Sequence, residues 1–328
     1  FLTEILVFKI KDKGYARHYQ HIEKQELPIA PLPEQRAIVA KLEQLFSKLD
    51  NSINNLKSAK NKLEIYRQAV LKKAFEGKLI TNESTEEDEP CNTKKAAEPQ
   101  TEYDFNKLPT GWKQTQLEKV MKLSKEKYKP ENEEDIFYIG LEHIEKDSGR
   151  LLKHAGLAKI RTLKNKFYQN QILYGKLRPY LNKVYLANEE GVCSTDILVF
   201  SPTEELFPKY IYWYMLSKKF VNEMSAKTSG VNLPRVSTKN ILKHKLILPI
   251  SINEQKEIVK EIESRFSVCD KLEESIDQSL EKAEALRQSI LKKAFEGELL
   301  SDEEIEACKK EPDWEPAEKL LERIKKEK

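Results

Sequence analysis

The sequence has no apolar run close to the roughly 18 residues that a membrane-spanning helix needs. It is also poor in cysteine. Its four cysteines, Cys91, Cys193, Cys269 and Cys308, lie far apart and show no CxxC spacing. This scarcity argues against a disulfide framework and against a structural zinc site. We therefore expect a protein of a reducing, cytoplasmic compartment that does not enter a membrane.

Motifs for catalysis are missing as well. The chain has no Asn/Asp-Pro-Pro-aromatic tetrapeptide, no glycine-rich turn suited to S-adenosylmethionine and no GxxxxGK[ST] for ATP. His18 and His21 form an HxxH, but no third ligand is spaced with them, which indicates a surface pair rather than a metal site. We expect no catalytic residue, no metal and no cofactor on this chain. A nuclease built on scattered carboxylates stays open, because no motif selects such a set.

Charge is unevenly distributed along the 328 residues, although the net charge is only +3. Thr81 to Lys107 carries eight acidic residues and three lysines, whereas Pro109 to Ile250 carries 24 basic and 15 acidic residues. Within the basic segment, Arg150 to Tyr185 has nine basic residues and no acid. Such a stretch favours a polyanionic partner such as a nucleic acid. The alternative is a lysine-rich surface without a function.

One word, LKKAFEG, occurs twice, at Leu71 and again at Leu291. Alignment at this offset, Glu34–Leu79 against Glu254–Leu299, gives 20 identities in 46 positions without a gap. The two copies therefore indicate a duplicated structural unit.

Each copy predicts a long helix. Glu34 to Glu76 contains neither Pro nor Gly and lies between Pro33 and Gly77, residues typical of the start and the end of a helix. Such a helix would be roughly 64 Å long. Apolar residues recur every seven positions and predict a coiled-coil seam. The seam residues are Leu42, Leu49, Leu56, Leu63 and Val70 in the first copy and Ile262, Cys269, Ile276 and Ile290 in the second, with Tyr66, Leu272 and Leu286 among their companions. We expect the copies to pack antiparallel against each other, although pairing with a second chain has the same period.

The segment between the copies predicts an α+β domain. Short strands are expected at Ile136–Leu141, Gln171–Tyr174, Asn182–Ala187, Ile197–Ser201 and Lys245–Pro249, and one helix at Phe207–Ala226. The resulting domain organisation is a tail at 1–26, a first long helix at 27–80, an acidic linker at 81–107, the mixed domain at 108–250, a second long helix at 251–300 and a charged tail with a short helix at 301–328. The length of the chain favours two or three folded domains.

Several sequence motifs resemble motifs of the specificity subunits of type I restriction–modification systems. PLPEQRAIVAKLE at Pro31 and SINEQKEIVKEIE at Ser251 resemble the starts of that family's two conserved helices. LPTGWK at Leu108 resembles the beginning of its target recognition domains. YGKLRPYLNK, CSTDILVF and SGVNLPRVS follow in the family's order.

The resemblance implies a DNA-binding subunit that reads half of a bipartite target. It also implies partners: double-stranded DNA, DNA methyltransferase subunits and a restriction or translocase subunit, which would carry S-adenosylmethionine and ATP with magnesium. The chain departs from the family because it holds one full recognition domain, with Phe1–Glu26 at most the remnant of another. We therefore also expect either a longer protein or a shortened subunit that self-associates to regain two recognition domains.

The candidate DNA-binding residues lie in three segments of the basic domain. Arginine can donate two hydrogen bonds to O6 and N7 of a guanine, while lysine more often contacts a phosphate. The candidates are Lys164, Lys166, Lys176, Arg178, Tyr180, Lys183, Ser229, Asn232 and Arg235. Two structural alternatives stay open, namely that Arg178 is a buried partner of Asp196 and that SGVNLPR is an ordinary connection. We expect Asp196 itself to orient an arginine or backbone amides.

Two other classes of protein compete with DNA recognition. A coiled-coil adaptor would use its basic domain to bind RNA or protein, and a stand-alone nuclease or methyltransferase would need a catalytic site. The missing motifs weigh against the second class, and the acid-free basic segment weighs against a purely structural adaptor.

Overall fold

A computed structural model describes residues 28–79, 108–130, 135–152, 155–230 and 232–326. The predicted tail at 1–26 and the predicted acidic linker at 81–107 lie outside them. The chain divides into two compact units. One contains the described residues from 64 to 269, and the other combines the described residues up to Leu63 with those from Asp270 onward. Each unit therefore includes part of both long helices.

The two copies of the repeat form the helices α3 (Leu32–Phe75) and α8 (Ile252–Glu296). Their C-terminal ends close in the same way. The amide of Lys78 donates to the carbonyl of Lys73 at 2.9 Å, and the amide of Glu298 donates to that of Lys293 at 2.8 Å. Gly77 (φ +72°) and Gly297 (φ +76°) supply the left-handed residue that this cap requires. The word KKAFEG is thus a helix end whose glycine reverses the chain.

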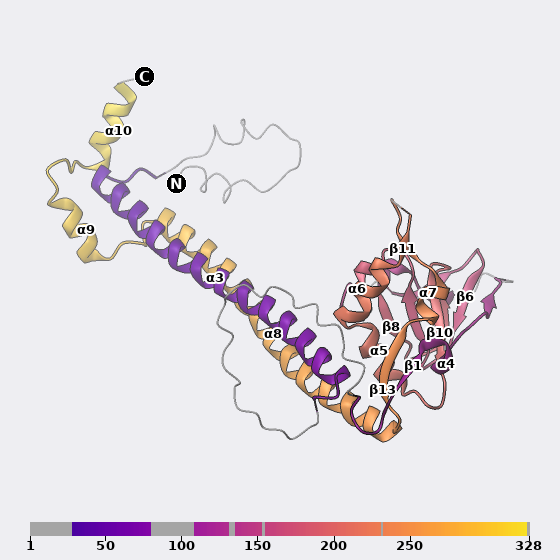
Figure 1. Cartoon of the computed structure of the whole chain (residues 1–328). Coiled ribbons are helices and arrows are strands. Elements are labelled where there is room, and N and C mark those ends of the chain that lie inside the picture. The colour runs from indigo at the N-terminus through magenta and orange to yellow at the C-terminus, as the bar shows by residue number, and fades with distance from the viewer. Residues whose placement is uncertain (1–27, 80–107, 131–134, 153–154, 231, 327–328) are drawn as a thin grey trace. The chain divides into compact units, whose positions relative to one another are not determined.

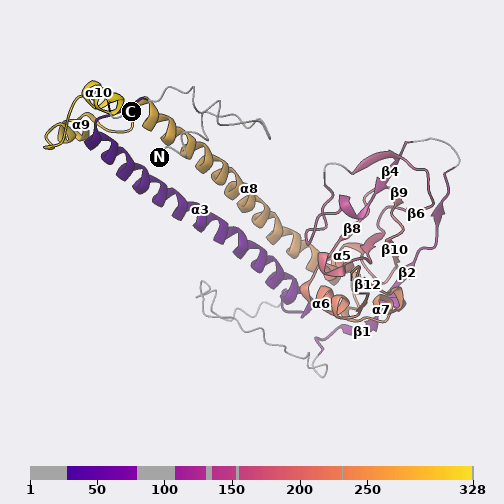
Figure 2. The same cartoon turned by 90° about the horizontal axis from the view of Figure 1, so that it is seen from above.

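The unit that combines residues up to Leu63 with residues from Asp270 onward is built on the antiparallel pairing of α3 with α8 (Figure 2). Lys60 Nζ lies 2.7 Å from Asp277 Oδ1. Asp50, which precedes Lys60 on α3, pairs with Arg287, which comes after Asp277 on α8. Near the start of α3, a small apolar cluster joins Ile38 to Ala294. Residues near the start of α3 thus pair with residues near the end of α8, so the two helices are antiparallel, as expected from the sequence.

The seam is narrow. Leu42, Leu49, Ile262 and Cys269 are buried, whereas Leu56, Leu63, Ile276 and Ile290 are only half-buried. The predicted companions Tyr66, Leu272 and Leu286 are exposed, so their assignment to the seam was wrong. A pair of helices covers only one stripe of each, and these side chains lie outside that stripe.

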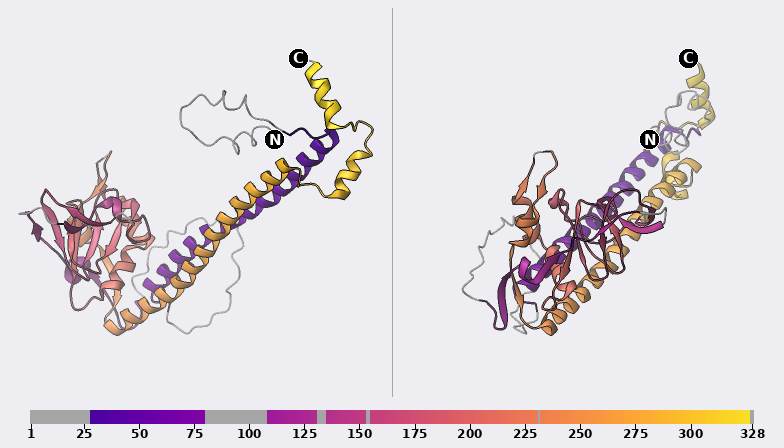
Figure 3. Two further views of the ribbon diagram at one scale, coloured as in Figure 1. Left: turned by 180° about the vertical axis from the view of Figure 1, so that it is seen from behind. Right: turned by 90° about the vertical axis from the view of Figure 1, so that its right-hand side faces the viewer.

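Two short helices follow α8 in the same unit: α9 (Asp302–Lys309) and α10 (Ala317–Lys326) (Figure 3). A capping box at Ser301 begins α9, which the sequence analysis did not predict. The segment that carries these helices is tied to the first turns of α3. The Arg36 guanidinium donates two hydrogen bonds to the Asp313 carboxylate, with nitrogen–oxygen distances of 2.8 and 2.9 Å. Lys41 forms an ion pair with Glu304.

The globular unit contains two larger sheets, of order β2-β10-β7-β8 and β3-β6-β9-β4-β5, and two small ones, β1-β13 and β11-β12. The strands are β1 (Trp112–Gln116), β2 (Met121–Leu123), β3 (Lys127–Tyr128), β4 (Asp135–Ile139), β5 (Gly156–Lys159), β6 (Lys164–Phe167), β7 (Ile172–Gly175), β8 (Val184–Leu186), β9 (Gly191–Cys193), β10 (Ile197–Pro202), β11 (Thr228–Ser229), β12 (Arg235–Val236) and β13 (Lys245–Pro249). The remaining elements are α4 (Leu117–Val120), η1 (Leu141–His143), η2 (Pro179–Leu181), α5 (Pro208–Met215), α6 (Lys218–Ala226) and α7 (Thr238–Leu242).

The first and last strands of the globular unit pair with each other. β1 runs antiparallel to β13 from Trp112↔Pro249 to Gln116↔Lys245. Trp112 Nε1 also donates to Glu254 of α8 at 2.7 Å, and the fully buried Gln255 donates to the carbonyls of Glu205 and Pro249. These contacts join the beginning of the domain to the first turn of α8.

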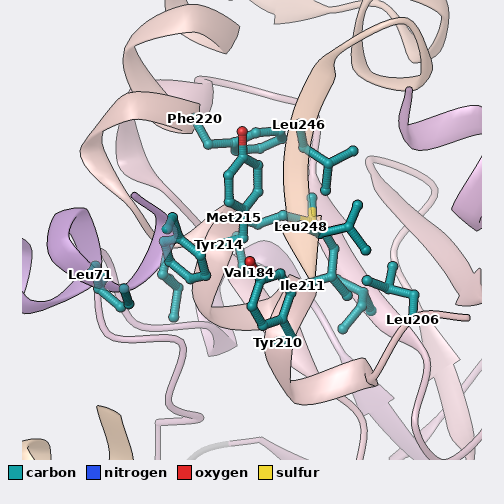
Figure 4. Packing of buried hydrophobic residues seen from close by; sticks show 14 of the residues in the cluster. Leu71, Val184, Leu206, Tyr210, Ile211, Tyr214, Met215, Phe220, Leu246 and Leu248 are labelled. Carbon is teal, nitrogen blue, oxygen red and sulfur yellow. The ribbon is translucent and has the colours of Figure 1, made fainter. Parts of the chain in front are cut away.

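The core of this unit includes the ends of both long helices. Leu71 and Phe75 of α3 pack with Tyr210, Tyr214 and Met215 of α5, and Ile258 and Ile262 of α8 belong to the same cluster. The Phe75 ring stands edge-on to the Tyr210 and Tyr214 rings, with centroids 5.3 and 5.1 Å apart. Figure 4 shows Leu71 reaching this group of aromatic side chains. The compact unit therefore extends beyond the 108–250 expected for the mixed domain.

The fold class, a mixed α/β domain together with long helices, is as predicted. The single helix expected at Phe207–Ala226 is instead two helices, α5 and α6. Ser217 separates them because its backbone is extended (φ −69°, ψ 143°) and its hydroxyl accepts the Phe220 amide as an N-cap. Apolar periodicity continues through the break, so it could not reveal the change of direction.

Candidate nucleic-acid interface

Three loops of the globular unit come together at the end of β7. They are residues 176–181 after β7, residues 194–196 before β10, and the β11–β12 hairpin, described at 228–230 and 232–236. We call these residues the turn surface. The amide of Lys176 donates to the Asp196 carbonyl at 3.1 Å, and the amide of Arg178 donates to the Pro234 carbonyl at 2.8 Å. The amide of Val236 in turn donates to the Lys176 carbonyl at 3.1 Å. Main-chain hydrogen bonds thus hold the three loops in one register.

Arg178 occupies a strained position on this surface. Its φ and ψ of 50° and 62° are left-handed, and so are those of Asn182 at 45° and 53°. For residues other than glycine such a conformation costs about 1–3 kcal/mol and is concentrated at functional sites. The 3-10 turn η2 lies between the two residues, and the side-chain amide of the buried Asn182 donates to the Leu216 carbonyl at 3.2 Å. The strain is therefore held by buried contacts.

The Arg178 side chain is exposed. Asp196 instead faces two other cations, with its Oδ1 3.5 Å from Lys176 Nζ and 3.7 Å from Arg235 Nη2. The alternative that made Arg178 a buried partner of Asp196 is thereby wrong. The expectation that Asp196 orients an arginine fits Arg235. Lys176 also donates to the Thr195 carbonyl at 2.9 Å, so its ammonium is positioned by the loop before β10.

The hairpin presents the remaining candidates of the SGVNLPR word. Ser229 pairs with Arg235 across β11 and β12, and Ser229, Asn232 and Arg235 are all exposed. Gly230 has φ +95°, and a Cβ built on it would lie 3.3 Å from the Leu233 carbonyl oxygen. The hairpin stands out from the body of the domain (Figure 1). Its loop is therefore more than a plain link between a helix and a strand.

Three predicted lysines lie elsewhere. Lys164 and Lys166 alternate on β6 of the five-stranded sheet, where they share one face and lie over the rings of Tyr138 and Tyr168 at 5.4 and 4.9 Å. The contact with the Tyr168 hydroxyl raises the pKa of Lys166. Lys183 donates to the Leu141 carbonyl at 2.6 Å and is half-buried. Lys164 and Lys166 thus lie on a different element from Arg178, whereas Lys183 follows η2 in sequence and has a structural partner.

A buried histidine joins α5 and α6 to the segment that follows α7 and its C-cap. His244, only 1% exposed, lies just after α7 between the Tyr214 hydroxyl, 2.7 Å from Nε2, and Glu223, 3.0 Å from Nδ1. The contact with His244 lowers the pKa of the Glu223 carboxyl, against the opposing effect of its own burial. Burial raises the pKa of the Cys193 thiol to about 12, which makes it an inert core residue.

Sequence reasoning missed two features of this site. Leu233 is about half exposed at the tip of the hairpin, and Glu223 of α6 pairs with His244, the residue before β13. The apolar residue inside the polar word SGVNLPR was a usable signal for Leu233. Nothing in the sequence links Glu223 to His244. In the described part of the chain, no group of three or more His, Cys, Asp or Glu is placed to hold a metal ion, and no helix is long and apolar enough to cross a membrane.

Known proteins resemble this chain in sequence. The model of the type I restriction modification DNA specificity domain matches residues 109–282, slightly more than half of the chain. The EcoDI specificity subunit of Escherichia coli is 26% identical over 97% of this chain and 73% of its own length. The EcoBI specificity subunit, also from Escherichia coli, is 28% identical over 92% of this chain but only 64% of its own length.

A solved structure supports the fold. A chain from a study of complex assembly and conformational transition in the type I R-M system has a TM-score of 0.68 at 18% identity. The match covers 91% of this chain and 69% of that one.

Proposed function

The chain belongs to the type I restriction modification DNA specificity domain family, and on that premise we propose that it recognises a sequence in double-stranded DNA for partner subunits. It would act without catalysing a reaction itself. The turn surface carries this proposal. It combines three cationic side chains, Lys176, Arg178 and Arg235, on loops whose main chains are hydrogen-bonded to one another.

The cations of the turn surface suit different tasks. Lys176 is held by the Thr195 carbonyl and Asp196, so its charge suits a phosphate contact that sets the position of the protein. Arg178 is exposed and its backbone is strained, which suits a fork on a guanine edge in the major groove. Lys164 and Lys166, on β6, would meet phosphates further along the duplex. In this proposal the sequence preference depends mainly on Arg178 and Arg235.

The proposal is tested by selecting preferred duplexes from a random pool with the full chain and then measuring affinity at rising salt. Arg178→Ala should cost about 1–3 kcal/mol on the selected sequence and much less on an unrelated one. Arg178→Lys keeps the charge but removes the fork, so it should lose the preference while it keeps the salt dependence. An unchanged preference in both variants would remove Arg178 from sequence recognition.

The partners proposed are modification subunits, and through them a restriction subunit, docked on the long helices. Exposed apolar side chains on α8 support this part. Leu272 and Leu286 are each about half exposed, and they are two heptads apart, which places them on one face of the helix. Apolar side chains gain nothing from exposure to water, whereas an interface with a partner would bury them. S-adenosylmethionine, ATP and magnesium would then be bound by those partners.

A further inference from the structure

We propose that Tyr180 and Leu233 form an apolar wedge that enters the stack of a duplex between neighbouring bases. The inference rests on the proposed DNA recognition and deepens it. It adds a second way of reading sequence, through how easily a base step is opened, to the hydrogen bonds of the arginines. Leu233 had no role in the proposal above, and Tyr180 had no role of its own.

The first observation is exposure. Tyr180 is 50% exposed and Leu233 is 49% exposed. Both lie on the turn surface, two residues after Arg178 and one residue before Pro234. Since the Arg178 amide donates to the Pro234 carbonyl at 2.8 Å, the segments that carry the two side chains are bonded to each other.

The second observation is the rigidity of both supports. Tyr180 is the middle residue of η2, between the buried Pro179 and the half-buried Leu181. Left-handed residues bound this turn on either side, and the amides of Leu181 and Asn182 donate back to Arg178 and Pro179 at 2.9 Å. The main chain that carries the exposed Tyr180 side chain is therefore constrained on both sides. Strain of this kind points to a role for the group that it presents.

The third observation is the charge around the wedge. Lys176, Arg178 and Arg235 lie on the same hydrogen-bonded loops as the two apolar side chains, and the Asp196 carboxylate faces Lys176 and Arg235. A duplex offers phosphates on its outside and apolar base faces inside, which complements loops that carry both cations and apolar side chains. Proteins that bend DNA insert leucine and aromatic side chains between base steps in this way, and aromatic rings stack on bases. A protein partner would need an acidic rim around an apolar pocket, so the charge favours DNA.

The chemistry makes a specific demand on the target. Opening a stack costs least at pyrimidine–purine steps, especially TA and CA. We therefore expect such a step at a constant position in the selected duplexes, at a base pair whose edges neither arginine reads.

The test uses the full chain and a selected duplex with 2-aminopurine placed at each position in turn, because its fluorescence rises when it unstacks. Wild-type protein should raise the signal at one step. Tyr180→Ala and Leu233→Ala should each remove most of that rise and weaken binding about 5- to 100-fold on that duplex. Tyr180→Phe should behave like wild type, since the ring remains. Leu157→Ala is the matched control, because Leu157 is 74% exposed on β5 and is not part of the turn surface.

Three outcomes would overturn the wedge. A flat signal in a complex that keeps its sequence preference refutes the wedge and leaves the proposed function intact. Absence of salt-dependent duplex binding refutes both. Variants that keep the fluorescence rise but lose a modification subunit on co-purification would assign Tyr180 and Leu233 to a protein interface instead. All four variants change exposed side chains, and circular dichroism verifies that each is folded.

Discussion

At the scale of single residues, the structure separates side chains that the sequence makes look alike. Lys176, Lys183 and Arg178 come from one ten-residue word, yet they do different things. Lys183 donates to the Leu141 carbonyl, Lys176 is held beside Asp196, and only Arg178 combines an exposed side chain with a left-handed backbone. Hydrogen-bonding partners that are distant in sequence decide which cation is available to a ligand.

Glu223 provides a prediction at this scale. Its pKa lies below the ordinary 4.5, so its charged form stabilises the fold. That contribution is complete above about pH 4.5 and is lost as the pH falls through the lowered value of the folded protein. Glu223→Gln should therefore lower the free energy of unfolding at pH 7 by about 1 kcal/mol, and by less at pH 4.

Urea unfolding across this pH range measures the effect. Glu189→Gln, which changes an exposed carboxylate of the same domain, is the control and should change little at any pH. A Glu223→Gln effect that stayed constant from pH 7 to pH 4 would show that the charge of Glu223 does not contribute. The cations that also lower the pKa of Glu223, Lys219 and Lys227, both lie on α6 or at its end.

At the scale of elements, one repeated word serves two surroundings. In the first copy Leu71, Ala74 and Phe75 are part of the core of the globular unit. In the second copy Ala294 packs against Ile38 and Leu42 of α3. The helix cap is the same at both ends because it depends only on local hydrogen bonds. Packing differs because the antiparallel pairing places the end of α8 beside the start of α3, whereas the end of α3 packs in the globular core.

The two cap glycines give a matched pair of variants. A Cβ on Gly77 would lie 2.7 Å from Pro109 Cγ and 3.3 Å from the Trp112 ring, whereas a Cβ on Gly297 meets nothing within 4 Å. Alanine at either position costs about 1–2 kcal/mol for its left-handed backbone. Gly77→Ala should cost about 1–3 kcal/mol more, because Pro109 and Trp112 must move. Thermal unfolding of both variants checks this, and equal effects would contradict the packing of LPTGWK on α3.

At the scale of the whole molecule, both long helices take part in both compact units. Residues 64–75 of α3 and 252–269 of α8 pack in the globular unit, and the remainder of each helix is in the other unit. Any subunit docked on α8 therefore touches an element that continues into the core of the DNA-recognition domain.

The exposed leucines of α8 test the partner proposal. Leu272→Glu with Leu286→Glu should abolish co-purification with the modification subunit, because two carboxylates would be buried without partners. Affinity of the variant chain alone for the selected duplex should stay within about twofold of wild type, since neither leucine is on the turn surface. Gln288→Glu adds charge at an exposed position of the same helix and is the control. Co-purification that survived the double substitution would move the docking site elsewhere.

The sequence by itself determined the elements whose signals are local. A repeat without internal Pro or Gly predicted two long helices, and α3 and α8 lie within the expected segments 27–80 and 251–300, because capping and heptad spacing need no distant partner. Charge patterning and the words LPTGWK and YGKLRPYLNK indicated a nucleic-acid-binding domain and its family. Strands β7, β10 and β13 were recognisable from their continuous apolar runs.

Only the tertiary structure decided the features that depend on contacts between distant segments. The pairing of β1 with β13 and the exposure of Leu272 both depend on the arrangement of segments that lie far apart in sequence. The turn surface is the clearest case. Three main-chain hydrogen bonds join residues 176–178 to residues 196 and 234–236, and these bonds determine which cations and apolar side chains stand together. Side-chain type can be read from the sequence, but such proximity is set by the folded backbone.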